Sequence, residues 1–345
     1  MGVTAIERRD WARESLRGVQ NITFPSFTPD LSELDEEGIR WDVRQAVAHG
    51  FFATLCACET GLTFDEARRF VSIVCDEASG KLLVAVTLLF DSLEQNLAMA
   101  YHAADAGCDL LQIGFPPNYY PDSEEQIFQV LHTLARATEL GVILYPSPHY
   151  NFERFHPSAF PPAVLERLSE LANVVAVEAG EPGLAADMVS RFGGKLLINN
   201  PIERQLPLMV LAAQQQYIGP GCYEAFQSPE QRNVVDYFAL LRQGKTAEAM
   251  EIYWKLTPAR GLFEAKMMPT AMLGCYHWPL QKYYQWLTGG NGGYTRQPCM
   301  KLHQFELEPI KFTLMQLGIM PRQPDEEFYI GRANRERGLA ARKTL

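Results

Sequence analysis

The sequence predicts a (β/α)8 TIM barrel followed by a helical C-terminal extension. First, a chain of 345 residues can bury one large core, and barrels of eight strand–helix units commonly fill this length. Second, short β-branched apolar runs alternate with helix-like segments through the first two thirds of the chain. Third, the helix-like segments that follow have no strands between them. A doubly wound open sheet is the alternative, because periodicity alone does not show that a sheet closes.

The expected strands are apolar at consecutive positions, which is typical of parallel strands covered on both faces. They span residues 22–24, 51–55, 81–89, 110–115, 142–145, 174–177, 196–199 and 217–219. The helical spacing of apolar residues predicts helices between them at residues 35–49, 63–78, 92–106, 123–140, 161–171, 185–192 and 205–216. Thr63 and Glu66 form a predicted capping box at the start of one helix, and Gly107 ends another.

The domain organisation follows from where this alternation begins and stops. We expect an N-terminal segment at 1–20, the barrel at 21–225, a helical region packed on the barrel at 226–333 and a tail at 334–345. Helices are expected in the helical region at residues 229–242, 247–257, 261–273 and 309–317. The tail is basic and lacks periodicity, which predicts disorder. The glycine-rich run 289–293 is expected to be a flexible loop, because no strand precedes it and no Lys-Ser/Thr follows it.

Composition excludes some classes of function. The net charge of -10 argues against a nucleic-acid interface and against binding to an acidic membrane surface. Residues 1–20 lack the apolar core of a signal peptide, and no apolar run approaches membrane-spanning length. The seven cysteines are an odd number, and the Cys56–Cys58 spacing is too short for a zinc pair. A reducing, cytoplasmic location is therefore expected.

A carboxylate stands at the end of the most regular strand. The apolar run 174–177 leads directly into Glu178 and then into a turn at 180–183. Parallel α/β folds place their chemistry at the carboxyl ends of strands. An arbitrary glutamate is more often a solvated loop residue, but this position favours a functional site. Glu59 also falls at the end of an expected strand.

Four ordered landmarks carry a resemblance to a known family. They are Thr28-Pro29 with Gly50 before a strand, the helix start 62–68, the loop 117–125 and the run Leu144-Tyr145-Pro146-Ser147-Pro148. Together they resemble the dihydrodipicolinate synthase / N-acetylneuraminate lyase family of (β/α)8 aldolases and dehydratases, over residues 22–258. No landmark is specific alone, and together they are not specific for any member's substrate.

Two departures from the family pattern bear on mechanism. The resemblance implies a lysine at the end of the sixth strand that forms a Schiff base with a 2-oxo acid, and Glu178 stands there instead. A carboxylate cannot form an imine. Lys195 begins the next strand and is expected at the opposite mouth of the barrel. In the family's carboxylate-binding Gly-Thr-Thr-Gly-Glu loop, Cys56 and Ala57 replace the paired threonines.

The resemblance also implies roles for other side chains. Tyr145 matches the catalytic tyrosine, which can donate or relay a proton, although an aromatic cap over the barrel mouth is the alternative. Tyr119 matches a tyrosine that reaches a neighbouring subunit's site, or simply packs at an interface. His149 can act near neutral pH, but a lone loop histidine is more often a surface residue. The predicted catalytic residues are Glu178 and Tyr145, and the predicted substrate-binding residues are Glu59, Thr60, Tyr119, His149 and Asn199.

Three functions remain open. The first is an imine-free lyase for dehydration or aldol-type C–C chemistry on a small oxygenated, 2-oxo acid-like substrate, with Glu178 as base and Tyr145 as acid. The second is a non-catalytic metabolite-binding protein. The third is a metal-assisted lyase or hydrolase in which His149, Asn199 or Asn200 joins the carboxylates. No cofactor and no metal are predicted, and the expected partners are a small-molecule substrate and further copies in a homodimer or homotetramer.

Overall fold

The computed structural model describes residues 5–116, 119–147, 150, 152–157, 159–180, 182–271, 275–298 and 300–339. The chain forms two compact units, each assembled from two separate segments. Unit 1 contains residues 1–20 and 83–220, and unit 2 contains residues 21–82 and 221–345. None of the described helices combines the length and the apolar character that a membrane crossing requires.

Eight strands form one sheet in the order β7-β6-β5-β4-β3-β2-β1-β8. Each strand neighbours the one before it in the chain, and β1 pairs in parallel with β8. This cyclic order is that of a (β/α)8 TIM barrel, so the predicted fold is confirmed. The strands are β1 (Gly18–Thr23), β2 (Ala53–Cys56), β3 (Leu83–Leu88), β4 (Leu110–Ile113), β5 (Gly141–Leu144), β6 (Val174–Glu178), β7 (Leu197–Asn199) and β8 (Tyr217–Ile218).

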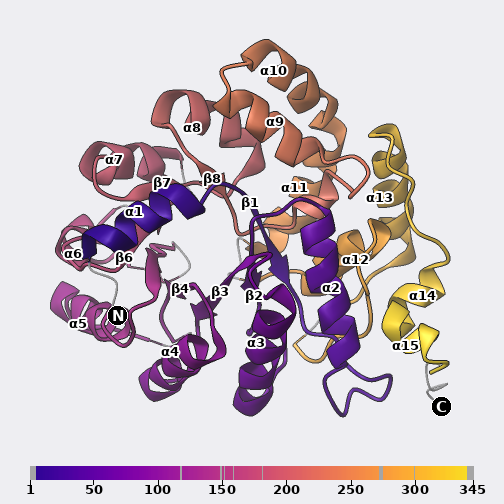
Figure 1. The fold of residues 1–345 in the computed structure, drawn as a ribbon, viewed down its shortest axis with the longest axis horizontal. Helices are drawn as coiled ribbons and strands as arrows, with labels where there is room; N and C mark the ends of the chain where they lie inside the picture. The colour runs from indigo at the N-terminus through magenta and orange to yellow at the C-terminus, as the bar shows by residue number, and fades with distance from the viewer. Residues whose placement is uncertain are drawn as a thin grey trace. The chain divides into compact units, whose positions relative to one another are not determined.

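Helices alternate with the strands through residue 213, as the sequence predicts (Figure 1). They are α1 (Ala5–Ser15), α2 (Glu36–Ala48), α3 (Phe64–Ala78), α4 (Leu93–Ala106), α5 (Glu124–Ala135), α6 (Pro162–Leu168), α7 (Pro182–Phe192), the short 3-10 helix η2 (Glu203–Gln205) and α8 (Leu206–Ala213). Helix α5 is shorter than predicted. Asn173 Nδ2 donates to the carbonyls of Ala135, Thr138 and Leu140, so the chain there is held outside the helix.

Local sequence signals fix several helix ends. In the capping box of α3, the Thr63 hydroxyl accepts from the Glu66 N–H at 3.3 Å, and the Glu66 carboxylate accepts from the Thr63 N–H at 2.9 Å. Helix α4 ends at Gly107, whose φ of 90° lies in the left-handed region that glycine adopts without strain. Both predictions are confirmed.

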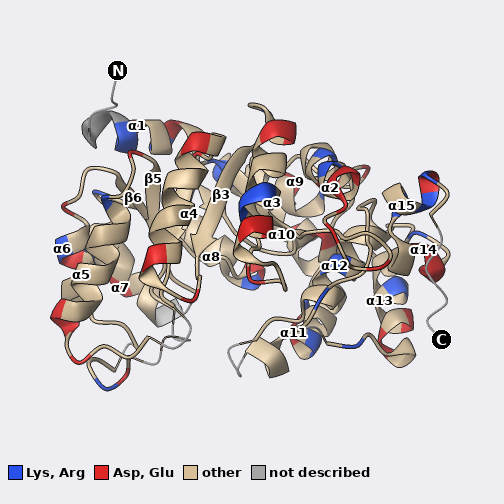
Figure 2. Cartoon of the chain, turned by 90° about the horizontal axis from the view of Figure 1, so that it is seen from below, with Lys and Arg blue, Asp and Glu red and all other residues tan. Residues whose placement is uncertain are grey.

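The outer faces of α2 and α3 carry side chains of both charges (Figure 2). Arg40 contacts Glu36 at 2.8 Å, Asp76 at 2.6 Å and Glu77 at 3.3 Å. These pairs lie at the surface, where each ion pair contributes little on its own. They join two consecutive helices of unit 2 in a network.

The N-terminal segment is helical, which the sequence did not indicate. Helix α1 belongs to unit 1, and the Arg9 guanidinium donates to the carbonyl oxygens of Ser169, Leu171 and Val174. These carbonyls precede or begin β6. The helix therefore covers the amino end of the strand that ends in Glu178.

Unit 2 contains the C-terminal helices. They are the 3-10 helix η3 (Tyr223–Ala225), α9 (Asn233–Arg242), α10 (Thr246–Lys255), α11 (Thr257–Ala271), α12 (Trp278–Leu287), α13 (Gln304–Gln316), α14 (Asp325–Ile330) and α15 (Arg332–Glu336). The sequence missed α12 because buried polar residues such as Lys282 and Gln285 interrupt its apolar pattern.

Two expectations for the C-terminal region need correction. Residues 289–293 form a loop, as predicted, but the loop is packed into the protein: Gly289 to Gly293 are buried, and a side chain at Gly290 would meet Asp42 Oδ1 at 2.9 Å. The predicted disordered tail also begins too early. Asn334 is completely buried within α15, and its amide donates to the carbonyl of Phe27 at 3.1 Å. Residues 340–345 lie outside the described part of the chain.

Candidate active site

Glu178 is the last residue of β6 and is buried in unit 1, with 5% of its surface exposed. The four preceding strand residues are each at most 1% exposed, so an apolar strand delivers the carboxyl group to its position. In the pairing of β6 with β7, Glu178 lies opposite Asn199, the last residue of β7. The two predicted site residues therefore share one edge of the sheet.

The Glu178 carboxyl group has an environment that disfavours charge. Its Oε2 atom is enclosed and has no hydrogen-bond partner among the described residues. Burial raises the pKa of Glu178 well above its usual range. Tyr217, at the start of β8, has a raised pKa as well. Burial is the larger cause, and the negative charge of an ionised Glu178 is the smaller one. Burial therefore favours the neutral form of the Glu178 carboxyl group and of the Tyr217 phenol.

The amide of Asn199 is engaged within unit 1. Its Nδ2 donates to the carbonyl of Gly219, and its Oδ1 accepts from Gln215 Nε2 at 3.4 Å. Asn200 is equally enclosed, and its Oδ1 accepts from the N–H of Ile202 at 2.9 Å. Asn199 thus contacts residues on either side of β8, and Asn200 contacts the segment directly after β7. These hydrogen bonds stabilise the end of β7.

An aromatic cluster follows β4 and β5. Tyr145 is half-buried and meets the ring of Tyr150 edge-on, with centroids 6.1 Å apart. Tyr119 stacks on Phe115 at 5.2 Å, and Phe115 meets Tyr150 edge-on at 5.0 Å. Burial raises the pKa of Tyr119, and the negative charge of Asp122 raises it further by a smaller amount. The predicted residues Tyr119 and Tyr145 therefore belong to one aromatic cluster. Phe115 and Tyr150, which were not predicted from the sequence, connect them.

The Tyr150 hydroxyl packs closely against Gly114. A side chain at Gly114 would come within 2.5 Å of the Tyr150 hydroxyl oxygen and within 2.5 Å of Leu89. The hydroxyl thus reaches the backbone just after β4. The predicted residue His149 lies outside the described residues.

Glu59 and Thr60 belong to unit 2 and follow β2. Glu59 is half-buried, its Oε2 atom is enclosed without a partner among the described residues, and burial raises its pKa to about 7. The Thr60 hydroxyl donates a hydrogen bond to the carbonyl of Ala57 at 2.7 Å, so the hydroxyl proton is engaged within the turn itself. Burial also raises the pKa values of Cys56 and Cys58, which favours the neutral thiol form of both side chains.

The structure also indicates which residues the sequence missed. Tyr217 stands in a strand of two residues, so no alternation marks it in the sequence. Lys195 precedes β7 and pairs with Glu170 at 2.6 Å, at the amino ends of the strands, as expected. Across the described residues, no group of three or more His, Cys, Asp or Glu side chains is arranged to hold a metal ion.

The sheet order defines a (β/α)8 barrel, a fold whose enzymes carry their active sites at the carboxyl ends of the strands, and Glu178 is buried at such an end. Residues 16–272 match the pattern that defines the Dihydrodipicolinate synthetase family. The chain belongs to this family, and it is a lyase. The resemblance seen in the sequence is confirmed.

Curated relatives and solved structures agree with this assignment. The 4-hydroxy-tetrahydrodipicolinate synthase of Methanopyrus kandleri is 26% identical over 315 residues, which cover 89% of this chain and 98% of that protein. The corresponding synthase of Methanothrix thermoacetophila is 27% identical over 281 residues, covering 77% and 90%. The fold resembles N-acetylneuraminate lyase from Fusobacterium nucleatum with a TM-score of 0.71, 18% identity and coverage of 88% and 99%. It also resembles the dihydrodipicolinate synthase of Aquifex aeolicus with a TM-score of 0.72, 17% identity and coverage of 89% and 100%.

Proposed function

We propose that this lyase acts on a small oxygenated substrate without a Schiff base, with Glu178 in the position of the family lysine. The observation that carries the proposal is the Glu178 carboxyl group, which is buried at the end of β6 with one oxygen unpartnered among the described residues. A carboxyl group cannot form an imine with a carbonyl carbon. The chemistry that it offers is proton transfer.

The raised pKa of Glu178 favours a proton donor in the resting enzyme, the reverse of the base role expected from the sequence. In a dehydration, the C–O bond of the substrate breaks, the Glu178 hydroxyl protonates the departing hydroxyl, and water leaves. The adjacent carbon gives its proton to the resulting carboxylate as the C=C bond forms. Because the cycle begins and ends with a neutral carboxyl group, it suits a strand end that disfavours charge.

The family supports a hydroxylated 2-oxo acid as substrate. The N-acetylneuraminate lyase of Fusobacterium nucleatum has been solved with pyruvate, which is a 2-oxo acid. A carbonyl group acidifies the neighbouring C–H bond, which is the bond that an imine-free dehydration has to break. Tyr145 would hold the carbonyl oxygen through its phenol as negative charge develops there. An aldol-type C–C cleavage would use the same two groups.

The test is turnover of a panel of hydroxylated 2-oxo acids by the full-length protein, with products identified by mass spectrometry. Glu178→Gln keeps the shape of the side chain and removes the transferable proton, so we expect turnover to fall at least about a hundredfold with binding retained. Tyr145→Phe should lose less, because water can replace a phenol as donor. Glu203→Gln changes another buried glutamate of unit 1 and is the matched control.

Two outcomes would contradict the proposal. A ligand that binds wild type and Glu178→Gln equally well, with no product formed, would identify a metabolite-binding protein instead. A lysine adduct trapped by borohydride in the presence of pyruvate would show that an imine forms after all.

We also propose a cytoplasmic homodimer or homotetramer. The six described cysteines are free thiols, which supports a reducing compartment. Tyr120, on the loop that the family resemblance associates with a partner subunit, is 74% exposed. Large exposed aromatic rings are common at protein interfaces.

A further inference from the structure

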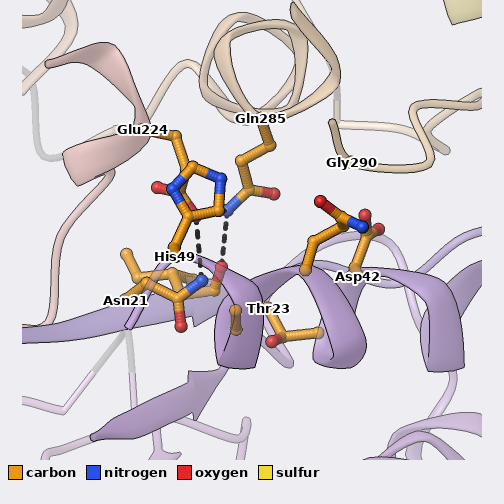
Figure 3. A pocket seen from close by; sticks show the side chains of 10 residues that line it. Asn21, Thr23, Asp42, His49, Glu224, Gln285 and Gly290 are labelled. Atoms are coloured by element: carbon orange, nitrogen blue, oxygen red, sulfur yellow. Dashed lines mark hydrogen bonds between the residues drawn. The ribbon is translucent and has the colours of Figure 1, made fainter. Parts of the chain in front are cut away.

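The C-terminal helices of unit 2 differ in how they meet water. Every residue of α12 after Trp278 is buried, and Gln285 of this helix is bonded inside the unit. Its Nε2 donates to Glu224 Oε1 at 3.1 Å, and Asn21 Nδ2 donates to the same oxygen at 2.9 Å (Figure 3). Helix α13 instead has one buried face and one exposed face. The exposed face of α13 is largely apolar, and the proposed reaction does not use it.

Helix α13 is apolar on both faces. Its buried face packs three aliphatic side chains into unit 2, which are Leu307, Ile310 and Leu314. On the exposed face, Phe305, Phe312 and Met315 are 71%, 58% and 45% exposed, and these three residues form the α13 stripe. Phe305 and Phe312 are two helical turns apart and Met315 follows three residues later, so all three share one side of the helix. A helix that is apolar all round is typically buried, so we expect the stripe to be covered in the assembled protein.

The acidic residues beside the α13 stripe already have basic partners. Glu306 accepts from Lys266 Nζ at 3.3 Å, and the same nitrogen lies 5.3 Å from the centroid of the Phe305 ring. Glu308 pairs with Lys311 at 3.2 Å. Because both acids of the helix are paired, the stripe offers little to a strongly basic partner, and two copies of it do not repel each other strongly.

The exposed residues of α13 are placed symmetrically about position 310. Gln304 and Gln316 lie six residues from this position on either side, and Phe305 and Met315 lie five residues from it. A two-fold axis brings residue i of one copy to residue j of the other, and j to i. Two antiparallel α13 helices centred on this position therefore place Phe305 against Met315 twice, with a glutamine pair at each end. The helix dipoles also oppose each other in this arrangement, which is favourable.

The exposed area of the stripe suits the centre of an interface between proteins. A large aromatic side chain has an area of roughly 150–250 Å², so the three partly exposed side chains present on the order of 300 Å². A standard interface buries about 800 Å² on each partner, with an apolar centre and a polar rim. The stripe supplies such a centre, and Gln304 and Gln316 belong to the rim.

We propose that the α13 stripe is a contact between two copies of this chain, packed antiparallel about a two-fold axis. The stripe belongs to unit 2, whereas the loop of Tyr120 belongs to unit 1, so the two surfaces are separate. It also lies beyond residues 16–272, the part of the chain that matches the family. A particle that uses both contacts would contain four chains in a closed arrangement.

The first test is the mass of the full-length protein by sedimentation velocity at micromolar concentration. Phe312→Asp places a charge in the centre of the stripe, so we expect its particle to have half the mass of the wild-type particle. Trp254→Asp is the matched control, because Trp254 is a 64% exposed aromatic residue of α10 in the same unit, and it should keep the wild-type mass. The proposal is overturned if Phe312→Asp keeps the wild-type mass. A monomeric wild type overturns it as well, since the stripe would then serve another partner.

The second test is disulfide cross-linking of the full-length Phe305→Cys/Met315→Cys variant with copper phenanthroline as oxidant. Within one helix these positions are about 15 Å apart, too far for a disulfide, whose Cα atoms lie about 5.5–6 Å apart. A cross-link must therefore join two chains, and we expect a covalent dimer. Phe305→Cys alone should give none, because the same position in an antiparallel copy also lies about 15 Å away. Wild type, which carries the exposed Cys275, gives the background. No dimer above this background, or equal dimer from the single variant, contradicts the antiparallel contact.

Discussion

The buried carboxyl group of Glu178 makes stability depend on pH in a defined direction. Its folded-state pKa is raised well above 4.5 by burial, whereas in the unfolded chain it returns to an ordinary value. Between these two values the unfolded state releases the proton and the folded state keeps it. The free energy of unfolding therefore decreases with rising pH, by up to about 1.4 kcal/mol per pH unit for this group.

Glu178→Gln removes this dependence. We expect the variant to gain stability relative to wild type as pH rises from about 5 to 8, measured by urea unfolding at each pH. Glu170→Gln is the control, because Glu170 is exposed, and its hydrogen bond to Lys195 lowers its pKa. Curves for wild type and Glu178→Gln that run parallel across this range would show that Glu178 is ionised in the folded protein.

At the scale of single residues, the sequence predicted where a side chain lies along a strand better than it predicted which groups that side chain contacts. The position of Glu178 at a strand end could be predicted because the apolar β-branched run before it is typical of a strand. Thr60 and Asn199 were expected to offer polar groups to a substrate, but their polar atoms contact Ala57, Gly219 and Gln215. Such contacts depend on segments that the sequence does not show to be neighbours.

At the scale of elements, the capping box of α3 gives the sharpest test. Thr63→Ala removes the hydroxyl that accepts from the Glu66 N–H, and loss of a helix cap costs about 1 kcal/mol. We expect a fall in Tm of roughly 1–2 °C, measured by calorimetry. Thr133→Ala changes an exposed threonine whose hydroxyl donates to the carbonyl of Gln129, and it should leave Tm nearly unchanged. Equal falls in both variants would show that the cap contributes nothing specific.

Helices with one apolar stripe could be predicted, and helices buried on several sides could not. Helix α3 has its apolar residues at helical spacing and the capping signal before them. Every residue of α12 after Trp278 is buried, including Gln281, Lys282 and Gln285, so polar and apolar positions give no stripe. Lys282 Nζ and Gln285 Nε2 donate to the carbonyls of Pro25 and Ile22, which lie 257 and 263 residues earlier in the chain. Sequence periodicity contains no information about such partners.

At the scale of the whole molecule, we expect two or four chains per particle. Static light scattering at micromolar concentration should give two or four times the mass of the chain, since soluble oligomers commonly have closed symmetry. Tyr120→Asp should reduce this mass, because it places a charge on the loop proposed to meet the partner. Tyr101→Asp alters an exposed tyrosine of α4 and should not. A monomeric mass for the wild type would contradict the prediction.

The pairing of distant segments within unit 2 has a consequence for synthesis on the ribosome. The carbonyls of Ile22 and Pro25 accept hydrogen bonds from Gln285 and Lys282, which follow them by 263 and 257 residues. At roughly 5–20 residues per second, translation separates these partners by tens of seconds. Throughout that interval the first strand of the nascent chain lacks the donors that complete it. Its early residues must remain accessible, or be shielded by chaperones, until the last third of the protein emerges.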